Sequence, residues 1–431
     1  MINNHFSTCL NIKYLPSFAV LLSVVGIYLS IIFNFSLTIT TWVILFPVFL
    51  IILRLRRYKL FDKSSLIVIC IVCLIFIITQ LLGRNFVILD CGITLIVSFL
   101  IFANTFNSKE ILFTNFIFLR KFYQLFTTFI LLELLLIFLD FSSVLAMIKG
   151  YHLGNRADLI TYFKIFNDFN APDTIFLGRQ IAGTLALSSC IIFFYSKFKN
   201  RLVWIMLSIF LFIFSATGIV LVISFLVLSF AFFRLKFGKE VSLIIKTKKI
   251  ILFFLFFILV IISFDFIVNS FFSRALSTDT IVSGLSEDDP GNGLTVRDYY
   301  LFSFLLPLYQ LLYEQSIISI LFGAPTEYLL NPNIFFAGDF GFGFNLLRGG
   351  ILIGFILLFY FLKYIWISVL VVRRNFLKNQ IFSLFKPLIL TNLIFILSQI
   401  HYINIQATVF FSFQFSLLVS SFWLYKKNKL I

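Results

Sequence analysis

The residues best suited to chemistry are arginines and carboxylates in two long polar stretches, at about 148–179 and 271–348. A planar guanidinium binds a phosphate through two parallel hydrogen bonds and keeps its charge at physiological pH. Several such groups around one anion would hold a diphosphate without a metal ion. A simpler role for each arginine is pairing with a nearby acid or with lipid headgroups. The candidates are Arg156, Arg179, Arg274, Arg297 and Arg348.

Two carboxylates are candidates for a general base. Asp339 stands in AGDFGFGF, where neighbouring glycines let the backbone approach a ligand closely. Glu327 stands in LFGAPTEYLL. Either carboxylate can accept the proton of a sugar hydroxyl that attacks an electrophile. The alternative for each is a structural acid that pairs with the loop around it.

Tyrosine and histidine side chains complete the candidate site. Tyr299 and Tyr300 can stack on sugar rings, or they belong to the aromatic belt of a membrane protein. His401 stands in a polar patch, residues 399–406, which either lines a cavity or bonds neighbouring helices. The three histidines have no metal-ligand spacing, so neither a metal site nor another cofactor is expected.

The composition is that of an integral membrane protein. Hydrophobic residues make up 61% of the chain and charged residues 12%, whereas soluble domains carry roughly 25% charged residues. We therefore expect an all-α polytopic fold with about twelve transmembrane helices of ~20 residues each. The expected spans lie near 15–34, 36–53, 64–82, 86–106, 122–147, 180–196, 202–216, 218–233, 250–270, 349–371, 387–402 and 405–425.

The distribution of basic residues predicts the topology. Most of the 34 lysines and arginines fall on alternate connections between the apolar segments, which places those connections and both termini in the cytoplasm. The same bias accounts for the net charge of +16 without a nucleic-acid partner. Residues 1–431 then form a single transmembrane domain with two long periplasmic loops, about 148–179 and 271–348, that carry short helices. No cytoplasmic connection has room for a nucleotide-binding domain.

Cys70 and Cys73 form a C-x-x-C pair inside an apolar segment with no neighbouring histidine or aspartate. Cysteine in such a setting behaves as a small hydrophobe, so we expect both to be buried. A redox or metal pair is the alternative.

The layout resembles the Wzy-type O-antigen polymerases, which belong with the O-antigen ligases to a glycosyltransferase C-type superfamily. The likeness is one of pattern and covers nearly the whole chain. An Arg-x10-Gly motif of some polymerases is absent after Arg156 and Arg274, and Asp339-Phe340 stands where ligases have His-Asn. The segments that carry the likeness are SATGIVLVISFLVL (215–228), TVRDYY (295–300), ILFGAPTEYL (320–329) and GDFGFGFNLLRGGILIGFILL (338–358).

The resemblance implies a metal-independent glycosyltransferase of the bacterial inner membrane that polymerises a surface polysaccharide. Its substrates would be undecaprenyl-diphosphate-linked oligosaccharides, and its other partners would be membrane lipids, with a chain-length regulator and a flippase as further candidates. Asp339 would act as the base, and nucleic acid would not be a partner. The diphosphates would be bound by Arg156, Arg179, Arg274 and Arg297, with Arg348 as the next candidate.

Other functions fit parts of the pattern. A lipid-linked oligosaccharide flippase has a similar length and span count, but the long stretch at 271–348 argues against it. An O-antigen ligase would show the His-Asn pair. A channel or scaffold without catalytic activity would leave the arginines of the two long stretches unexplained.

Overall fold

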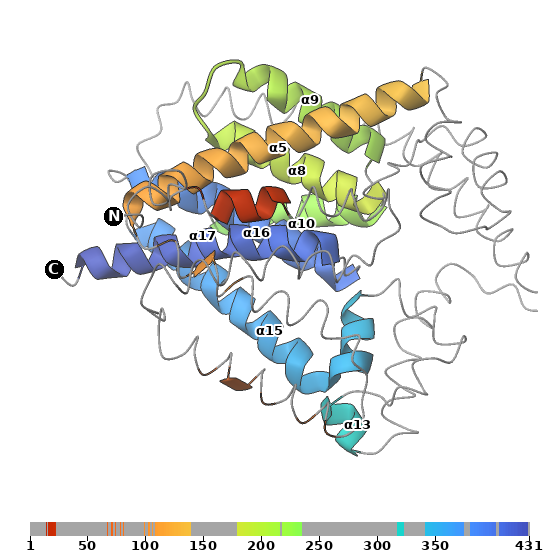
Figure 1. The fold of residues 1–431 in the computed structure, drawn as a ribbon, viewed down its shortest axis with the longest axis vertical. Helices are drawn as coiled ribbons and strands as arrows, with labels where there is room; N and C mark the ends of the chain where they lie inside the picture. The colour runs from red at the N-terminus through yellow and green to blue at the C-terminus, as the bar shows by residue number, and fades with distance from the viewer. Residues whose placement is uncertain are drawn as a thin grey trace, which may run out of the picture.

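The computed structural model describes residues 14, 16–22, 108–138, 179–215, 218–234, 317–322, 341–374, 380–401 and 405–429, with isolated positions between 67 and 106. These residues are predominantly helical (Figure 1). The helices are α5 (Lys109–Phe138), α8 (Arg179–Tyr195), α9 (Arg201–Ser215), α10 (Gly218–Arg234), α13 (Ile317–Phe322), α15 (Gly341–Arg374), α16 (Gln380–His401) and α17 (Ile405–Lys429).

The helices α8 and α9 form a tight antiparallel hairpin. Only residues 196–200 separate them, and Asn200 adopts a left-handed backbone conformation with φ of 60°. Asparagine tolerates this conformation better than most residues. The ring of Phe193 packs on Phe198 and on Trp204, at centroid distances of 5.7 and 5.9 Å, so aromatic contacts close the hairpin next to its turn.

The helix α17 lies at the centre of the bundle, and buried aromatic rings fix the direction of its neighbours. Against α5, Phe118 lies 6.4 Å from Phe413, whereas Phe126 lies 6.0 Å from Phe410, so the two helices are antiparallel. On α16, Phe395 contacts the same Phe410 at 5.8 Å. A buried core of this kind stabilises a bundle chiefly by removing apolar surface from water.

The direction of α15 is the same as that of α17. Phe361 lies 5.2 Å from Phe411, and Tyr364, further along α15, lies 6.4 Å from Phe422, further along α17. The α8–α9 turn is placed by α5, because the Arg120 guanidinium lies 4.7 Å above the Phe198 ring.

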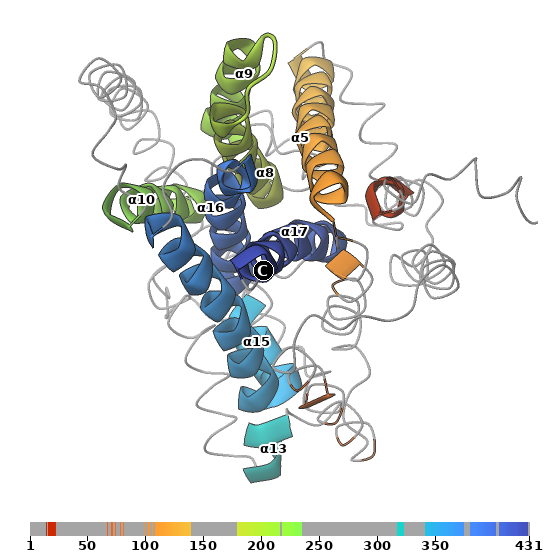
Figure 2. The ribbon, with the colours of Figure 1, turned by 90° about the vertical axis from the view of Figure 1, so that its left-hand side faces the viewer.

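These directions sort the helix termini into two groups. One end of the bundle collects the start of α5, the α8–α9 turn, the end of α15, the start of α16 and the end of α17. Figure 2 shows the bundle viewed from this end, with the C-terminal end of α17 near the centre of the picture. We call it the basic end, after its exposed residues Lys109, Lys197, Lys199, Arg201, Arg373, Lys426 and Lys427. The other end, which we call the opposite end, holds the starts of α8, α15 and α17 and the end of α16.

The prediction of a polytopic fold with about twelve transmembrane helices was wrong for the part of the chain that the structure describes. Within those residues, no helix has both the length and the hydropathy needed to cross a bilayer. The helices α8, α9 and α10 have 17, 15 and 17 residues, which is short of the ~20 that a span requires. The prediction counted apolar residues along the sequence, which does not fix the length of helix that forms.

Cys70 also departs from the prediction, since it is exposed in the structure. It lies on the same helical face as Ile67, Ile71 and Leu74, which are 56%, 39% and 59% exposed. The apolar composition of the segment was interpreted as burial, but this face is open. Cys73 lies outside the described residues.

Candidate functional site

The structure describes the backbone of three of the residues that the sequence singled out. Arg179 is the first residue of α8, Arg348 is in the first quarter of α15, and His401 is the last residue of α16. All three positions belong to the opposite end of the bundle, although they are far apart in sequence. The other candidates lie outside the described residues: Arg156, Arg274, Arg297, Tyr299, Tyr300, Glu327 and Asp339.

Asp339 is close in sequence to the start of α15. It precedes Gly341, the first residue of that helix, by two positions. Arg348 follows the same helix start by two turns of helix. Along the sequence, the first residue of α15 therefore lies between the candidate base, Asp339, and Arg348, one of the candidate diphosphate-binding arginines.

The helices that carry these termini are joined by a cluster of buried polar side chains, which we call the polar centre: Tyr123 of α5, Ser188 of α8, Asn392 of α16 and Gln414 of α17. The Tyr123 hydroxyl donates a hydrogen bond of 2.6 Å to Gln414 Oε1. Asn392 Nδ2 donates to the carbonyl oxygens of Leu388 and Gln414, at 2.7 and 3.4 Å. Hydrogen bonds therefore join α17 to α5 and to α16, and Ser188 of α8 adjoins the Tyr123 phenol.

The polar centre is not equipped for acid–base chemistry. Burial raises the pKa of the Tyr123 phenol well above its ordinary value, and the neighbouring Ser188 hydroxyl opposes this shift only in part. The phenol is therefore neutral at physiological pH and acts as a hydrogen-bond donor. Asn392 Oδ1 and Gln414 Nε2 are buried with no hydrogen-bond partner among the described residues, a cost of about 1–3 kcal/mol for each group.

Arg120 joins α5 to the α8–α9 turn. Its Nε is buried and has no hydrogen-bond partner within the described part of the chain, and burial lowers the pKa of its guanidinium from the ordinary value. The contact with the Phe198 ring, 4.7 Å from the centroid, offsets part of that desolvation. This arginine therefore has a packing role at the basic end.

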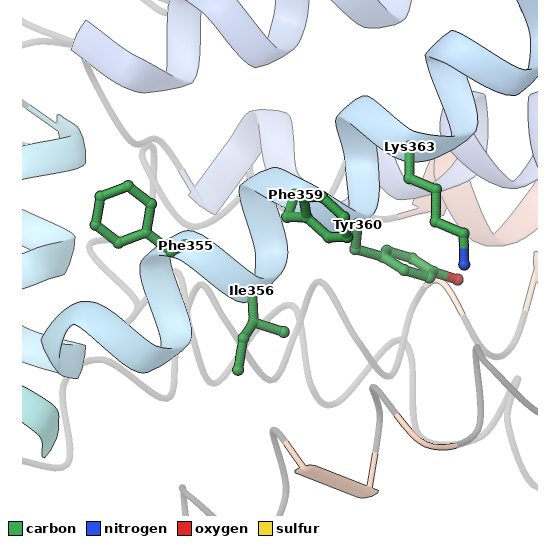
Figure 3. Close-up of a pocket in the computed structure, with 5 residues that line it drawn as sticks. All are labelled: Phe355, Ile356, Phe359, Tyr360 and Lys363. Atoms are coloured by element: carbon green, nitrogen blue, oxygen red, sulfur yellow. The ribbon is translucent and has the colours of Figure 1, made fainter.

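A pocket of about 410 Å³ lies on the side of α15. Figure 3 shows its lining residues over two turns of the helix, where the Tyr360 ring and the Lys363 side chain extend in the same direction. Phe355 and Phe359 are 51% and 73% exposed. Its surface is largely aromatic and bears one cation, which suits an amphiphile better than a free sugar. The lining residues are Phe355, Ile356, Phe359, Tyr360 and Lys363.

Neither the polar centre nor this pocket was predicted from the sequence. A signal for the polar centre was present, because Gln414 interrupts the apolar run VFFSFQFSLL, and polar residues within apolar helices tend to bond neighbouring helices. The pocket had a weaker signal, namely aromatic residues four apart at Phe355 and Phe359.

Across the described residues, no group of three or more histidine, cysteine, aspartate or glutamate side chains is arranged to hold a metal ion. Comparison with known proteins found no match to this chain among protein-family models, curated proteins or solved structures.

Proposed function

We propose that this chain is a metal-independent glycosyltransferase that polymerises oligosaccharide repeat units carried on undecaprenyl diphosphate, at the periplasmic face of the bacterial inner membrane. One observation carries the proposal. The termini that bear Arg179, Arg348 and His401 share one end of the bundle, whereas the exposed lysines are at the other end. Arg179 and Arg348 both carry the planar guanidinium fork that matches a phosphate group, which favours an anion site at that end.

The proposed reaction transfers the growing glycan from one lipid diphosphate to a new lipid-linked unit. The bond between the anomeric carbon and the diphosphate oxygen breaks, and its electron pair leaves with the diphosphate. A hydroxyl oxygen of the acceptor sugar forms the new bond to that carbon. Asp339 takes the hydroxyl proton, with Glu327 as the alternative base.

The arginines stabilise the leaving diphosphate. One further negative charge develops on the diphosphate as the bond to the anomeric carbon breaks, and fixed guanidinium donors stabilise it without reorganisation. Arg156, Arg274 and Arg297 join Arg179 and Arg348 in this role. Tyr299 and Tyr300 stack on the sugars, and His401 donates to a sugar or phosphate oxygen.

A strain that lacks the protein tests the proposal. If the protein is the polymerase, the strain makes lipopolysaccharide capped by a single repeat unit, and expression of the wild-type chain restores the ladder of long polymers. Complete loss of capping would instead assign the chain to the flippase or ligase class, and an unchanged ladder would exclude all three functions.

A purified-component assay gives the second test. The full chain, supplied with undecaprenyl-diphosphate-linked repeat units, is expected to produce longer lipid-linked glycans in the presence of a metal chelator. Failure to elongate these units, by protein that retains its helical circular-dichroism spectrum, would contradict the proposed activity.

A further inference from the structure

The basic end is a surface whose charge is almost entirely of one sign. Its seven cationic side chains come from four separate parts of the chain and are all exposed: Lys109, Lys197, Lys199, Arg201, Arg373, Lys426 and Lys427. Glu110 is the acidic residue at this end among those the structure describes. A cluster of positive charges with so few neighbouring acids attracts anions and raises their local concentration.

Exposed apolar side chains begin directly beside these cations. On α9, Arg201 is followed by Leu202 and Val203, which are 65% and 56% exposed, and Met206 one turn later is 65% exposed. On α17, Lys426 Nζ lies 4.9 Å from the centre of the Trp423 ring. Tryptophan beside lysine next to apolar surface is the arrangement found where a protein meets the headgroup layer of a membrane.

We infer that the basic end is a docking surface for anionic phospholipid headgroups. A phosphate-rich headgroup layer offers anions to the lysines and arginines and, just beneath them, an apolar layer to Leu202, Val203 and Met206. Nucleic acid would satisfy the cations alone and would leave these apolar side chains in contact with polar backbone or water. The inference does not depend on the proposed glycan chemistry, which belongs to the opposite end of the bundle.

The test measures lipid binding by the purified full chain in neutral detergent. Fluorescently labelled phosphatidylglycerol and phosphatidylcholine are titrated at about 50 mM and about 500 mM salt. We expect phosphatidylglycerol to bind at least about tenfold more tightly at low salt, since each surface cation adds to the attraction. The preference is expected to shrink at high salt, because exposed charges are screened.

A charge-removal variant locates the surface. Lys197→Gln/Lys199→Gln/Arg201→Gln is expected to lose most of the preference for phosphatidylglycerol. Thr128→Val, at an exposed position of α5 that is outside the basic end, is expected to keep it. If the triple variant does not fold, Lys426→Gln/Lys427→Gln probes the same surface from α17. Circular dichroism verifies helical content for each variant.

Several outcomes would overturn the inference. One is equal binding of the two lipids by the wild-type chain. Another is an unchanged preference in folded variants of both the α8–α9 turn and α17. Displacement of the lipid by inorganic phosphate at matched concentration would assign the site to free anions, and tight salt-dependent binding of a DNA duplex without lipid preference would assign it to nucleic acid.

Discussion

The two ends of the helix bundle carry lysine and arginine in different proportions. The basic end has five exposed lysines beside Arg201 and Arg373, whereas Arg179 and Arg348 lie at the opposite end. A lysine ammonium is a strongly hydrated point charge that suits diffuse attraction to a charged layer. An arginine presents a planar fork that matches the oxygens of one phosphate group. We therefore propose adhesion for the basic end, and recognition and catalysis for the opposite end.

The polar centre lies between these ends and belongs to neither. Its four side chains connect α5, α8, α16 and α17, so any change in their packing would move termini at both ends together. Its contribution is therefore positional. Loss of a polar-centre side chain should reduce stability, and loss of a side chain at either end should change binding or rate.

The largest expected effect is on the rate of glycan elongation. It is tested by comparing two arginines of the same helix, Arg348 and Arg373. Arg348→Ala should lower the rate of glycan elongation by at least about 100-fold, because a fixed donor to the developing charge is lost. Arg373→Ala at the basic end should change that rate by less than about twofold. The measurement is elongation of lipid-linked repeat units by purified protein. Equal losses in the two variants would remove the functional distinction between the ends.

The next effect concerns the core that holds the two ends apart. Phe415 is fully buried and lies 4.7 Å from Phe361 and 5.6 Å from Phe99. Phe415→Ala should cost about 3–5 kcal/mol of unfolding free energy, because a large cavity is left behind. Phe359→Ala is the matched control, since that ring is 73% exposed, and it should cost about 0.5 kcal/mol or less. Similar costs in denaturant unfolding would contradict the central position of α17.

A smaller effect tests the polar centre. Tyr123→Phe removes the donor to Gln414 Oε1 and should cost about 1–3 kcal/mol, because a buried acceptor is left unpaired. Thr128→Val on the same helix removes an exposed hydrogen bond of 3.0 Å and is the control. In a double-mutant cycle, Tyr123→Phe with Gln414→Leu should cost less than the sum of the single changes. Simple additivity would show that the two side chains do not interact.

The smallest expected effect is a decrease of stability at alkaline pH. It comes from two buried groups of α8, the helix that runs from one end of the bundle to the other. Burial raises the pKa of the Cys190 thiol from 9.0 to about 12 and that of the Tyr195 phenol from 10.0 to about 12. Both groups keep their protons to higher pH in the folded state than in the unfolded state. Their contribution to the free energy of unfolding is therefore complete below pH 9 and is lost as pH rises toward 12. For Cys190 the loss should reach about 1 kcal/mol near pH 10.

Unfolding monitored by circular dichroism from pH 8 to pH 11 measures this dependence. Cys190→Ala should show a shallower decline of stability with pH than the wild-type chain. The exposed Cys70 provides the control, and Cys70→Ala should leave the slope unchanged. Parallel slopes for all three proteins would show that the Cys190 thiol is not buried in the folded state.

The positions of several helices followed from the sequence, because long apolar runs bounded by polar residues set where a helix can form. The expected segments 180–196 and 218–233 correspond to α8 and α10 within one residue at each boundary. The start of α16 was missed by seven residues. The helix begins at Gln380 and continues through Pro387, whose carbonyl accepts a hydrogen bond of 2.8 Å from Thr391 Oγ1.

The candidate site was predictable only as a set of residue types. Arginine, aspartate and tyrosine in two long polar stretches indicate anion and sugar chemistry by their own side-chain properties. The sequence could not show that Arg179, Arg348 and His401 share one end of the bundle, because that depends on the directions of three helices. The expected transmembrane spans at 180–196, 202–216 and 218–233 failed for a related reason, since local hydropathy does not fix the length of a helix.

The sequence by itself determined where several apolar helices can form and the excess of positive charge, because these follow from local side-chain chemistry. Only the tertiary structure decided that lysines gather at one end and Arg179 and Arg348 at the other, and that Tyr123 and Gln414 meet in the core 291 residues apart along the chain. Contacts at that separation depend on how complete helices pack, and no local pattern encodes that packing.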